Sequence, residues 1–270
     1  MANIRPSSKR LRSGLGDVLH IVCQTYRNSR KTSMITEHSR TAFITGANKG
    51  IGKETARQLA QQGFAVFIGA RDMAKGREAA EELCNQGFEA TFIHLDITDP
   101  VSIKNAVGTF SQKADHLDVL INNAAVLEDH GEDITKLNTE MLDRTLKSNV
   151  TGPILVTQYF LPYLQKSPNG ARIVNVSSGA GALHDMDTYA PAYSISKTAL
   201  NAVTRQFAAA LHKHNIVVNC VDPGWVRTDM GGPSASRPVE KGADTIVWLA
   251  AQASPTETGK FWHDRRTVEW

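Results

Sequence analysis

From Thr41 onward the chain alternates short apolar runs with longer amphipathic stretches, and this alternation limits its possible folds more than any other feature. The pattern is typical of β-α-β units, in which helices connect parallel strands. Short connections favour right-handed crossovers and a doubly wound sheet. The sequence therefore predicts one α/β domain over residues 41–270, with a parallel sheet of about seven strands and helices on both faces.

The individual elements follow from the spacing of the apolar residues. We predict strands at residues 41–45, 65–70, 90–95, 119–122, 172–177, 216–221 and 260–262. We predict helices near residues 51–62, 73–86, 100–114, 138–165, 191–213 and 239–252. Since no internal repeat or long linker interrupts this part of the chain, we expect no second domain.

Charge is distributed unevenly along the chain. Residues 1–33 hold seven Lys and Arg against one acid, a net charge of +6, whereas residues 34–270 hold 23 against 26, a net charge of −3. A mildly acidic body predicts no nucleic-acid partner, because such binding usually needs a basic face. No stretch approaches the roughly 18–20 apolar residues of a membrane span. Cys23, Cys84 and Cys220 form no metal-spaced pair, which favours a reducing compartment, and we predict the cytoplasm.

Residues 1–40 form a basic leader that is rich in Arg and Ser, a composition seen in organellar transit peptides. Three interpretations stay open. The leader is a disordered or misassigned upstream extension, with Met34 as an alternative start, or a targeting peptide, or an ordered accessory segment. A transit peptide would direct the protein to a mitochondrion or another organelle instead of the cytoplasm.

Gly46, Gly50 and Gly52 lie where the first predicted strand turns into a helix. Glycine lets the backbone approach a pyrophosphate closely, and a helix N-terminus supplies partial positive charge. The G-x-x-x-G-x-G spacing departs from the usual G-x-G-x-x-G fingerprint, so a simple tight turn is the alternative. The position after the first strand of a β-α-β array favours a dinucleotide site.

The end of the second predicted strand bears on the choice of cofactor. Enzymes that prefer NAD commonly place a carboxylate there, to accept from the ribose hydroxyls. This chain has Gly69-Ala70-Arg71 instead. Arg71, together with Lys49 of the glycine turn, offers cations where the 2′-phosphate of NADP would lie. NADP(H) is therefore the predicted cofactor, and ordinary solvated surface charges are the alternative.

Polar residues follow the next two strands. Asp96 is able to accept from the adenine amino group or to cap the following turn. The segment Asn122-Asn123-Ala124-Ala125 is small and polar where the cofactor must pass, and stabilisation of the central sheet is the alternative role for Asn122.

Tyr193 and Lys197 are four residues apart in a predicted helix and therefore project from the same face. A free phenol has a pKa of about 10, and a neighbouring positive charge stabilises its ionised form. This pair predicts a proton donor beside an ammonium, and with the glycine turn it indicates hydride chemistry on a carbonyl. Ordinary packing of Tyr193 and solvation of Lys197 are the alternatives.

Five motifs follow one another in the order in which the short-chain dehydrogenase/reductase family has them, from about Thr41 to the C-terminus. They are Gly46-x3-Gly50-x-Gly52, Asn122-Asn123-Ala124-Ala125, Val174-Asn175-Val176-Ser177-Ser178, Tyr193-x3-Lys197 and Pro223-Gly224. The chain resembles this family, and the segments at residues 223–233 and 259–262 are similar to its NADPH-dependent carbonyl reductases. The resemblance implies a Rossmann-like fold.

The resemblance also implies the roles of the catalytic residues. Tyr193 would give a proton to the carbonyl oxygen, and Lys197 would hold the nicotinamide ribose and lower the pKa of Tyr193. Ser178 would donate a hydrogen bond to the substrate oxygen, with Ser177 as the alternative. Asn149 would position a water that connects Lys197 to solvent, unless it only marks a bend in its helix.

Thr228 is expected from the family to contact the nicotinamide carboxamide, and a loop cap is the alternative role. The predicted cofactor-binding residues are Gly46, Asn48, Lys49, Gly50, Ile51, Gly52, Arg71, Asp96, Ile97, Asn123, Ala124, Tyr193, Lys197, Pro223, Gly224, Val226 and Thr228.

The interval between Ser178 and Tyr193 is shorter than in the monomeric carbonyl reductases, which makes a homodimer or homotetramer plausible. We predict no metal site, because the loop that contains His184 is crowded and the family mechanism uses none. The apolar wall of the substrate mouth is predicted to consist of Leu183, Met186, Tyr189, Trp225 and Met230, with packing under a lid as the alternative for the last two.

The sequence thus predicts the NADPH-dependent reduction of a small to medium apolar aldehyde or ketone. The first alternative is an NADP-linked alcohol or hydroxysteroid dehydrogenase that works oxidatively. The second is a dinucleotide-binding redox sensor without turnover. Substrate identity depends on the variable loops, mainly residues 126–137, 179–192 and 225–238.

Overall fold

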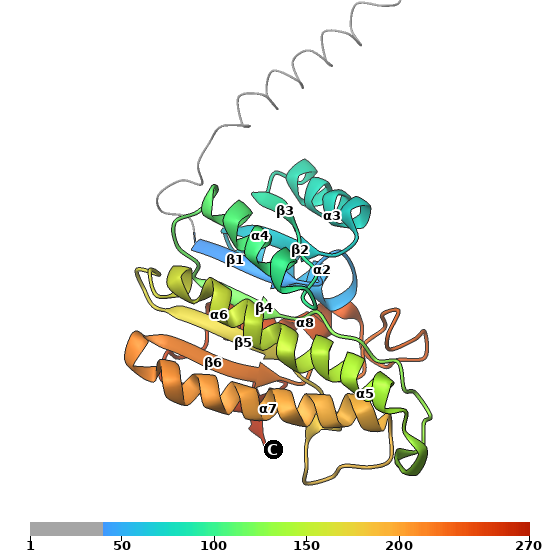
Figure 1. Cartoon of the computed structure of the whole chain (residues 1–270). Helices are drawn as coiled ribbons and strands as arrows, with labels where there is room; N and C mark the ends of the chain where they lie inside the picture. Colours follow the sequence, from blue (N-terminus) through green and yellow to red (C-terminus); the bar gives the residue numbers. More distant parts are fainter. Residues whose placement is uncertain (1–39) are drawn as a thin grey trace, which may run out of the picture. The chain divides into compact units, whose positions relative to one another are not determined.

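The computed structural model describes residues 40–270, and the predictions for the leader lie outside these residues apart from Arg40. The described part folds around one eight-stranded sheet, with helices on both faces (Figure 1). The strands are β1 (Arg40–Thr45), β2 (Phe64–Ala70), β3 (Ala90–His94), β4 (Val119–Asn122), β5 (Ala171–Val176), β6 (Ile216–Val221), β7 (Phe261–His263) and β8 (Arg266–Val268). The helices are α2 (Gly50–Gln61), α3 (Met73–Asn85), α4 (Pro100–Ser111), α5 (Thr139–Leu146), α6 (Gly152–Leu164), α7 (Pro191–Leu211) and α8 (Val239–Ala251).

The order of the strands, β3-β2-β1-β4-β5-β6-β7-β8, confirms the doubly wound prediction. β1 pairs in parallel with β2 on one side and with β4 on the other, so the winding reverses direction between β1 and β4. In such sheets ligands bind at the carboxyl ends of the strands beside this reversal. The glycine turn follows β1 directly and therefore lies at that point.

The sequence missed the antiparallel edge strand β8, which forms a hairpin with β7. β8 has only three residues and all of them are exposed, so no apolar alternation marks it. The hairpin turns at Asp264 and Arg265, which both have positive φ angles. Neither is a glycine, so the usual sequence signal of such a turn is missing as well.

Alternate residues of the central strands build two separate layers of core. Ile44 of β1 and Ile68 of β2 are buried with apolar residues of α2, α3 and α8. Phe43 and Phe67 on the opposite face stack at 6.4 Å and meet Phe110 of α4. Burial on both faces explains why the sequences of β1 and β2 are near-continuous apolar runs.

The helix predicted over residues 138–165 is interrupted. A π-helical turn, η2 (Lys147–Thr151), joins α5 to α6, and it buries Ser148 and Asn149. At the next residue, Gly152, an added Cβ would lie 2.9 Å from the carbonyl oxygen of Ile97. Single π turns often occur at functional sites. Here the turn directs Asn149 inward, toward the loop that follows β4.

Candidate active site

A cleft of about 1400 Å³ lies along the carboxyl ends of the parallel strands, and it is lined by both Arg71 and Tyr193. Apart from Asn149, every predicted catalytic or cofactor-binding residue lines it. These are Gly46, Asn48, Lys49, Gly50, Ile51, Gly52, Arg71, Asp96, Ile97, Asn123, Ala124, Ser178, Tyr193, Lys197, Pro223, Gly224, Val226 and Thr228.

The glycine turn needs its glycines for two reasons. Gly46 and Gly50 have positive φ angles of 66° and 55°, which other residues rarely adopt. At Gly52 an added Cβ would lie 2.5 Å from Nδ2 of Asn123, so the turn packs tightly on the segment after β4. The side chain of the N-cap residue, Lys49, forms no capping hydrogen bond with α2, and the first turn of this helix holds no acidic residue. Free N–H groups at a helix N-terminus that lines a cleft suit the pyrophosphate of a dinucleotide.

The two predicted phosphate-binding cations differ in their surroundings. Lys49 forms an ion pair with Asp229 at 2.6 Å, which ties the glycine turn to the loop after β6. Arg71 is exposed at the cleft and has no ion pair among residues 40–270. Arg71 is therefore the more available of the two for a 2′-phosphate.

Asp96 has one oxygen committed to its own turn. Oδ1 accepts from the backbone N–H and the hydroxyl of Thr98, at 2.9 and 2.7 Å. Burial works against ionisation, but these hydrogen bonds and the charge of Arg71 outweigh it and hold the pKa of Asp96 below its usual value. The capping role is thus present, and Oδ2 remains available to an adenine amino group.

The two asparagines at the carboxyl end of β4, Asn122 and Asn123, serve the scaffold. Asn122 is buried and donates to Oδ1 of Asn175 at 2.8 Å, which agrees with its alternative role in stabilising the sheet. Asn123 lines the cleft, and its Nδ2 donates to the carbonyl oxygens of Thr45 and Gly46, at 2.8 and 3.2 Å. Asn123 therefore supports the shape of the glycine turn.

Tyr193 and Lys197 lie together on α7, as their spacing predicts. Nζ of Lys197 is 5.4 Å from the centre of the Tyr193 ring and donates to the carbonyl oxygen of Val176 at 2.8 Å. Both side chains are buried.

Burial dominates the titration of this pair. Burial raises the pKa of Tyr193 above its ordinary value, although a hydrogen bond with Ser178 opposes this. Burial lowers the pKa of Lys197 to about 8. In the chain alone the pKa of Tyr193 is therefore raised rather than lowered, so the expected lowering by Lys197 remains a prediction for the complex with cofactor.

The structure separates the two candidate serines. The hydroxyl of Ser177 is buried and donates to Oδ1 of Asn201 at 2.6 Å, so a structural contact already occupies it. Ser178 is partly exposed in the cleft that Tyr193 also lines, and it opposes the rise in the pKa of Tyr193 that burial causes. This geometry favours Ser178 as the residue that meets the substrate oxygen.

The side chain of Asn149 does not line the cleft. It accepts from the N–H of Val126 at 2.9 Å and donates to the carbonyl oxygen of Val126 at 2.8 Å. It also donates to Oγ of Ser196 at 3.0 Å. The side chain thus has a scaffold function, and the predicted contact with a water remains a prediction.

Thr228 caps its loop and also lies at the cleft, and its predicted contact with the nicotinamide carboxamide remains a prediction. Its hydroxyl accepts from the N–H of Gly231 at 3.1 Å, so it caps the loop, and the residue also lines the cleft. An added Cβ at Gly50 would lie 3.2 Å from the methyl group of Thr228. The loop therefore contacts the glycine turn.

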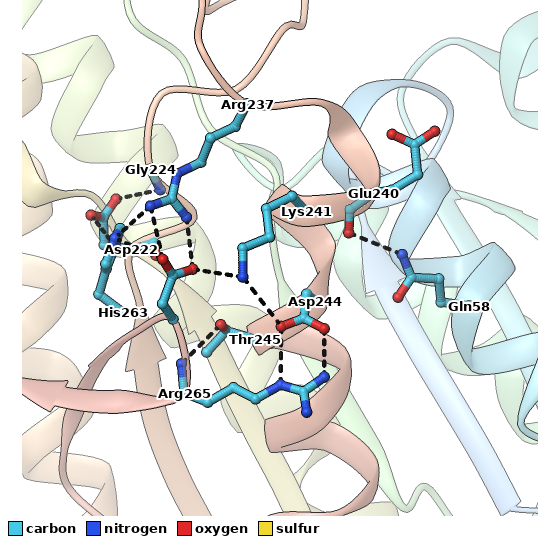
Figure 2. A network of polar contacts seen from close by, with 11 residues as sticks. Gln58, Asp222, Gly224, Arg237, Glu240, Lys241, Asp244, Thr245, His263 and Arg265 are labelled. Atoms are coloured by element: carbon cyan, nitrogen blue, oxygen red, sulfur yellow. Dashed lines mark hydrogen bonds and ion pairs between the residues drawn. The ribbon is translucent and has the colours of Figure 1, made fainter.

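Asp222 was not predicted from the sequence, although the two residues that follow it were. Asp222 lines the cleft, and its carboxylate accepts from the N–H of Gly224 at 2.9 Å and lies 2.9 Å from Nδ1 of His263 (Figure 2). Nε2 of His263 lies 2.7 Å from the guanidinium of Arg237. The only signal in the sequence was its position directly after a buried strand.

Arg237 joins this network to the C-terminal hairpin. It donates two hydrogen bonds to Asp264, at 2.8 and 3.0 Å. Its guanidinium packs on Gly224, where an added Cβ would lie 2.5 Å from Nε of Arg237. Lys241 of α8 also pairs with Asp264, at 3.1 Å (Figure 2). The turn at Pro223 and Gly224 therefore depends on residues from the hairpin and from the segment before α8.

Replacement of Arg237 by Ala is expected to destabilise the fold. Loss of a bidentate, partly exposed pair should cost about 1–2 kcal/mol of unfolding free energy at neutral pH, after allowance for solvent screening. The hydrogen bond from Arg237 is the main reason that the pKa of Asp264 is lowered to about 2. This contribution is complete above about pH 4, the pKa of a free Asp, and is lost as the pH falls toward the folded-state pKa.

Urea unfolding at neutral pH and at about pH 3 measures this effect. The difference between Arg237→Ala and the parent should shrink at the lower pH. Arg266→Ala is the control, because Arg266 is exposed on the same hairpin. Equal stability of the two variants at neutral pH would contradict the prediction.

Four of the five residues predicted for the apolar wall of the substrate mouth line the cleft. Met186, Tyr189, Trp225 and Met230 line the cleft, in agreement with the prediction. Leu183 is 65% exposed and does not line it, so its predicted place in the apolar wall is wrong. The indole of Trp225 also donates to the carbonyl oxygen of Gly231 at 2.8 Å, which holds the loop over the cleft in shape. His184 lies outside the lining as well, whereas Asp185 and Asp187 belong to it.

Within residues 40–270 no helix is long and apolar enough to cross a membrane. In the same range no three His, Cys, Asp or Glu side chains gather in a way that would hold a metal ion.

Comparison with known proteins agrees with this arrangement. A family model described as short chain dehydrogenase matches residues 40–238. A short-chain dehydrogenase, anuI, from Penicillium roqueforti is 35% identical over 240 residues, covering 84% of this chain and 94% of that protein. Carbonyl reductase 1 (NADPH) from Sus scrofa is 32% identical over 283 residues, covering 87% of this chain and 96% of that protein.

A solved structure is similar over almost its whole length. The NADPH-bound carbonyl reductase from chicken fatty liver has a TM-score of 0.79 and 29% sequence identity, and the match covers 86% of this chain and 99% of that chain. The family model covers strands β1 to β6, the glycine turn and the Tyr193-Lys197 pair. The chain therefore belongs to the short-chain dehydrogenase/reductase family.

Proposed function

We propose that the protein reduces an aldehyde or ketone to an alcohol with NADPH. The observation that carries the proposal is one continuous cleft that is lined by the glycine turn, by Arg71 and by the Tyr193-Lys197 pair. One part of this cleft thus has side chains that suit a nucleotide phosphate, and another part has side chains that suit a reacting carbonyl. The chain is similar to one carbonyl reductase that is named for NADPH and to another that binds NADPH. This similarity supports the same activity.

The residues present fit NADPH. The uncapped N-terminus of α2 suits the pyrophosphate, and Arg71 suits the 2′-phosphate. Asp96 retains one carboxylate oxygen for the adenine. When bound, NADPH supplies the hydride.

The protein's own part in the reaction is proton transfer and orientation. Tyr193 donates its phenolic proton to the carbonyl oxygen as negative charge develops there. The raised pKa of Tyr193 keeps the phenol protonated, which suits a donor. Ser178 donates a hydrogen bond to the same oxygen, and the charge of Lys197 then stabilises the phenolate that is formed.

The substrate class follows from the side chains at the mouth. Met186, Tyr189, Trp225 and Met230 are exposed apolar groups that line the cleft. They suit a small to medium apolar carbonyl compound, since their burial by a substrate would be favourable.

The test is the loss of NADPH absorbance in a panel of aldehydes, ketones, quinones and sugars. We expect NADPH oxidation only when an apolar carbonyl compound is present, and slower reverse turnover with the matching alcohol and NADP⁺. Dinucleotide binding without turnover across the panel would contradict the proposal and favour a redox sensor. Faster oxidation of alcohols at neutral pH would favour the oxidative dehydrogenase.

The rate of reduction is expected to fall above the pKa of Lys197, which is about 8. Below that pH the ammonium stabilises the phenolate, and above it the charge is lost. kcat/KM should therefore be level on the acid side and should fall about tenfold per pH unit on the alkaline side. A circular dichroism spectrum at each pH shows whether the protein stays folded. A level profile up to about pH 10 would contradict the role of Lys197.

A further inference from the structure

The helix that carries the proton donor lacks a cap of its own. α7 begins at Pro191, and the preceding residue, Ala190, has a φ of 42° and no side chain that could accept a hydrogen bond. The first N–H groups of a helix have no partner within the helix, so a buried helix start needs an acceptor from elsewhere. Ala190 and Pro191 are both buried.

Asp129 supplies that acceptor from the loop after β4. Its Oδ2 accepts from the N–H of Ala192 at 2.6 Å and from the N–H of Tyr193 at 3.3 Å. Asp129 has no exposed surface, and its Oδ1 has no hydrogen-bond partner among residues 40–270. Burial of a carboxylate is costly, so its presence here requires the partial positive charge of the helix N-terminus.

The peptide group of Tyr193 is held on its other side as well. Its carbonyl oxygen accepts from Oγ of Ser196 at 2.7 Å. That hydroxyl accepts from Asn149, which also binds both backbone groups of Val126. The loop after β4 is thus connected to the backbone of Tyr193 at two points, directly through Asp129 and indirectly through Asn149.

We propose that Asp129 is a positioning residue for Tyr193, and that it fixes the proton donor relative to the loop over residues 126–130. The inference rests on the proposed function. The phenol must lie within hydrogen-bond reach of the substrate oxygen, and a displacement of about 1 Å can cost about a hundredfold in rate. A direct bond to the backbone of the donor is the shortest route by which a residue outside the cleft can control that placement.

The same contact connects the donor to the substrate mouth. Glu128 and His130, the neighbours of Asp129 in the chain, both line the cleft. The ring of His130 lies edge-on to the ring of Tyr189 at 5.2 Å. Asp129 therefore connects the part of the cleft wall that would contact the substrate with Tyr193, the residue that would protonate the substrate.

Two variants at Asp129 test the inference. Asp129→Asn keeps an oxygen that is able to accept both hydrogen bonds, and only the charge is lost, so kcat should stay within about tenfold of the parent. Asp129→Ala removes both bonds, and kcat should fall about a hundredfold. NADPH affinity, measured by the fluorescence of the bound cofactor, should change less than about twofold in both variants, because Asp129 does not line the cleft.

A structural defect and a positioning defect give different kinetic signatures. If the donor is misplaced, proton transfer becomes slower, so the solvent deuterium isotope effect on kcat should be larger in Asp129→Ala than in the parent. A partly unfolded enzyme would lose active sites without any change in this isotope effect. Asp133→Ala is the matched control, since Asp133 is exposed in the same loop and caps only the short turn at Ile134–Lys136.

Several outcomes would overturn the inference. One is an Asp129→Ala variant that keeps kcat within about threefold of the parent, and another is an unchanged isotope effect despite a lower kcat. If Asp129→Ala does not fold, Asp129→Glu replaces it in the test. Glu keeps the charge but moves the carboxylate, so Asp129→Glu should have a lower kcat than Asp129→Asn. A higher kcat in Asp129→Glu would contradict the positioning role of Asp129. A parent protein without carbonyl turnover would instead refute the proposed function.

Discussion

Replacement of Tyr193 by Phe is expected to lower kcat for carbonyl reduction by about a thousandfold, within the range that loss of a general acid usually produces. Tyr193 is buried beside Lys197, and it lines the cleft together with Ser178. Phe keeps the ring and its packing but has no proton to donate. NADPH should therefore bind the variant with nearly the affinity of the parent.

The measurement is single-turnover reduction under saturating NADPH, together with a separate titration of the cofactor. Tyr189→Phe is the matched control, because Tyr189 is a second tyrosine of the same cleft and is 40% exposed. It should change KM more than kcat. If Tyr193→Phe turned over at the rate of the parent, Tyr193 would not be the donor.

Replacement of Arg71 by Ala is expected to reduce the preference for NADPH over NADH by about 10–100-fold, the value of a hydrogen bond to a charged group. Arg71 lines the cleft at the end of β2 and has no ion pair among residues 40–270. Its guanidinium is therefore able to bind the 2′-phosphate without the loss of an existing contact. kcat/KM for NADPH should fall, whereas the value for NADH should change little.

The ratio of kcat/KM for the two cofactors, at a fixed concentration of carbonyl substrate and of salt, is the quantity to compare. Arg77→Ala controls for the change in net charge, since Arg77 lies over the ring of Phe92, outside the cleft. Lys49→Ala should have a smaller effect, because Lys49 is already paired with Asp229. An unchanged ratio of kcat/KM for NADPH and NADH in Arg71→Ala would contradict the proposed phosphate-binding role of Arg71.

Features that depend on local spacing were predictable from the sequence. The apolar runs that became β1 and β2 are buried on both faces, and such runs have few alternatives in a chain of alternating elements. Tyr193 and Lys197 lie on one side of α7 because a helix turn brings residues four apart together. Gly46 and Gly50 have the positive φ angles that a tight turn after a strand demands.

Features that depend on contacts between distant segments were not predictable. β8 is three exposed residues paired with β7, and the π turn at Lys147–Thr151 has no signal in apolar spacing. The pairing of Lys49 with Asp229 joins residues that are 180 positions apart. Burial raises the pKa of Tyr193, and the burial of a side chain cannot be read directly from the sequence. The spacing of Tyr193 and Lys197 alone predicted a lowered pKa.

Asp129 is the clearest example of a residue whose contacts the sequence does not predict and the folded structure determines. In the sequence it is one acid among several in a polar segment, with no partner at helical or strand spacing. Its role exists only because the fold brings this loop to the start of α7, 63 positions later in the chain. Periodicity records which face of an element is buried, and so it was sufficient for strands β1 to β7 and for the placement of Tyr193 and Lys197 on one side of a helix. The partners of a buried charge depend on how those elements pack, and only the folded chain determines them.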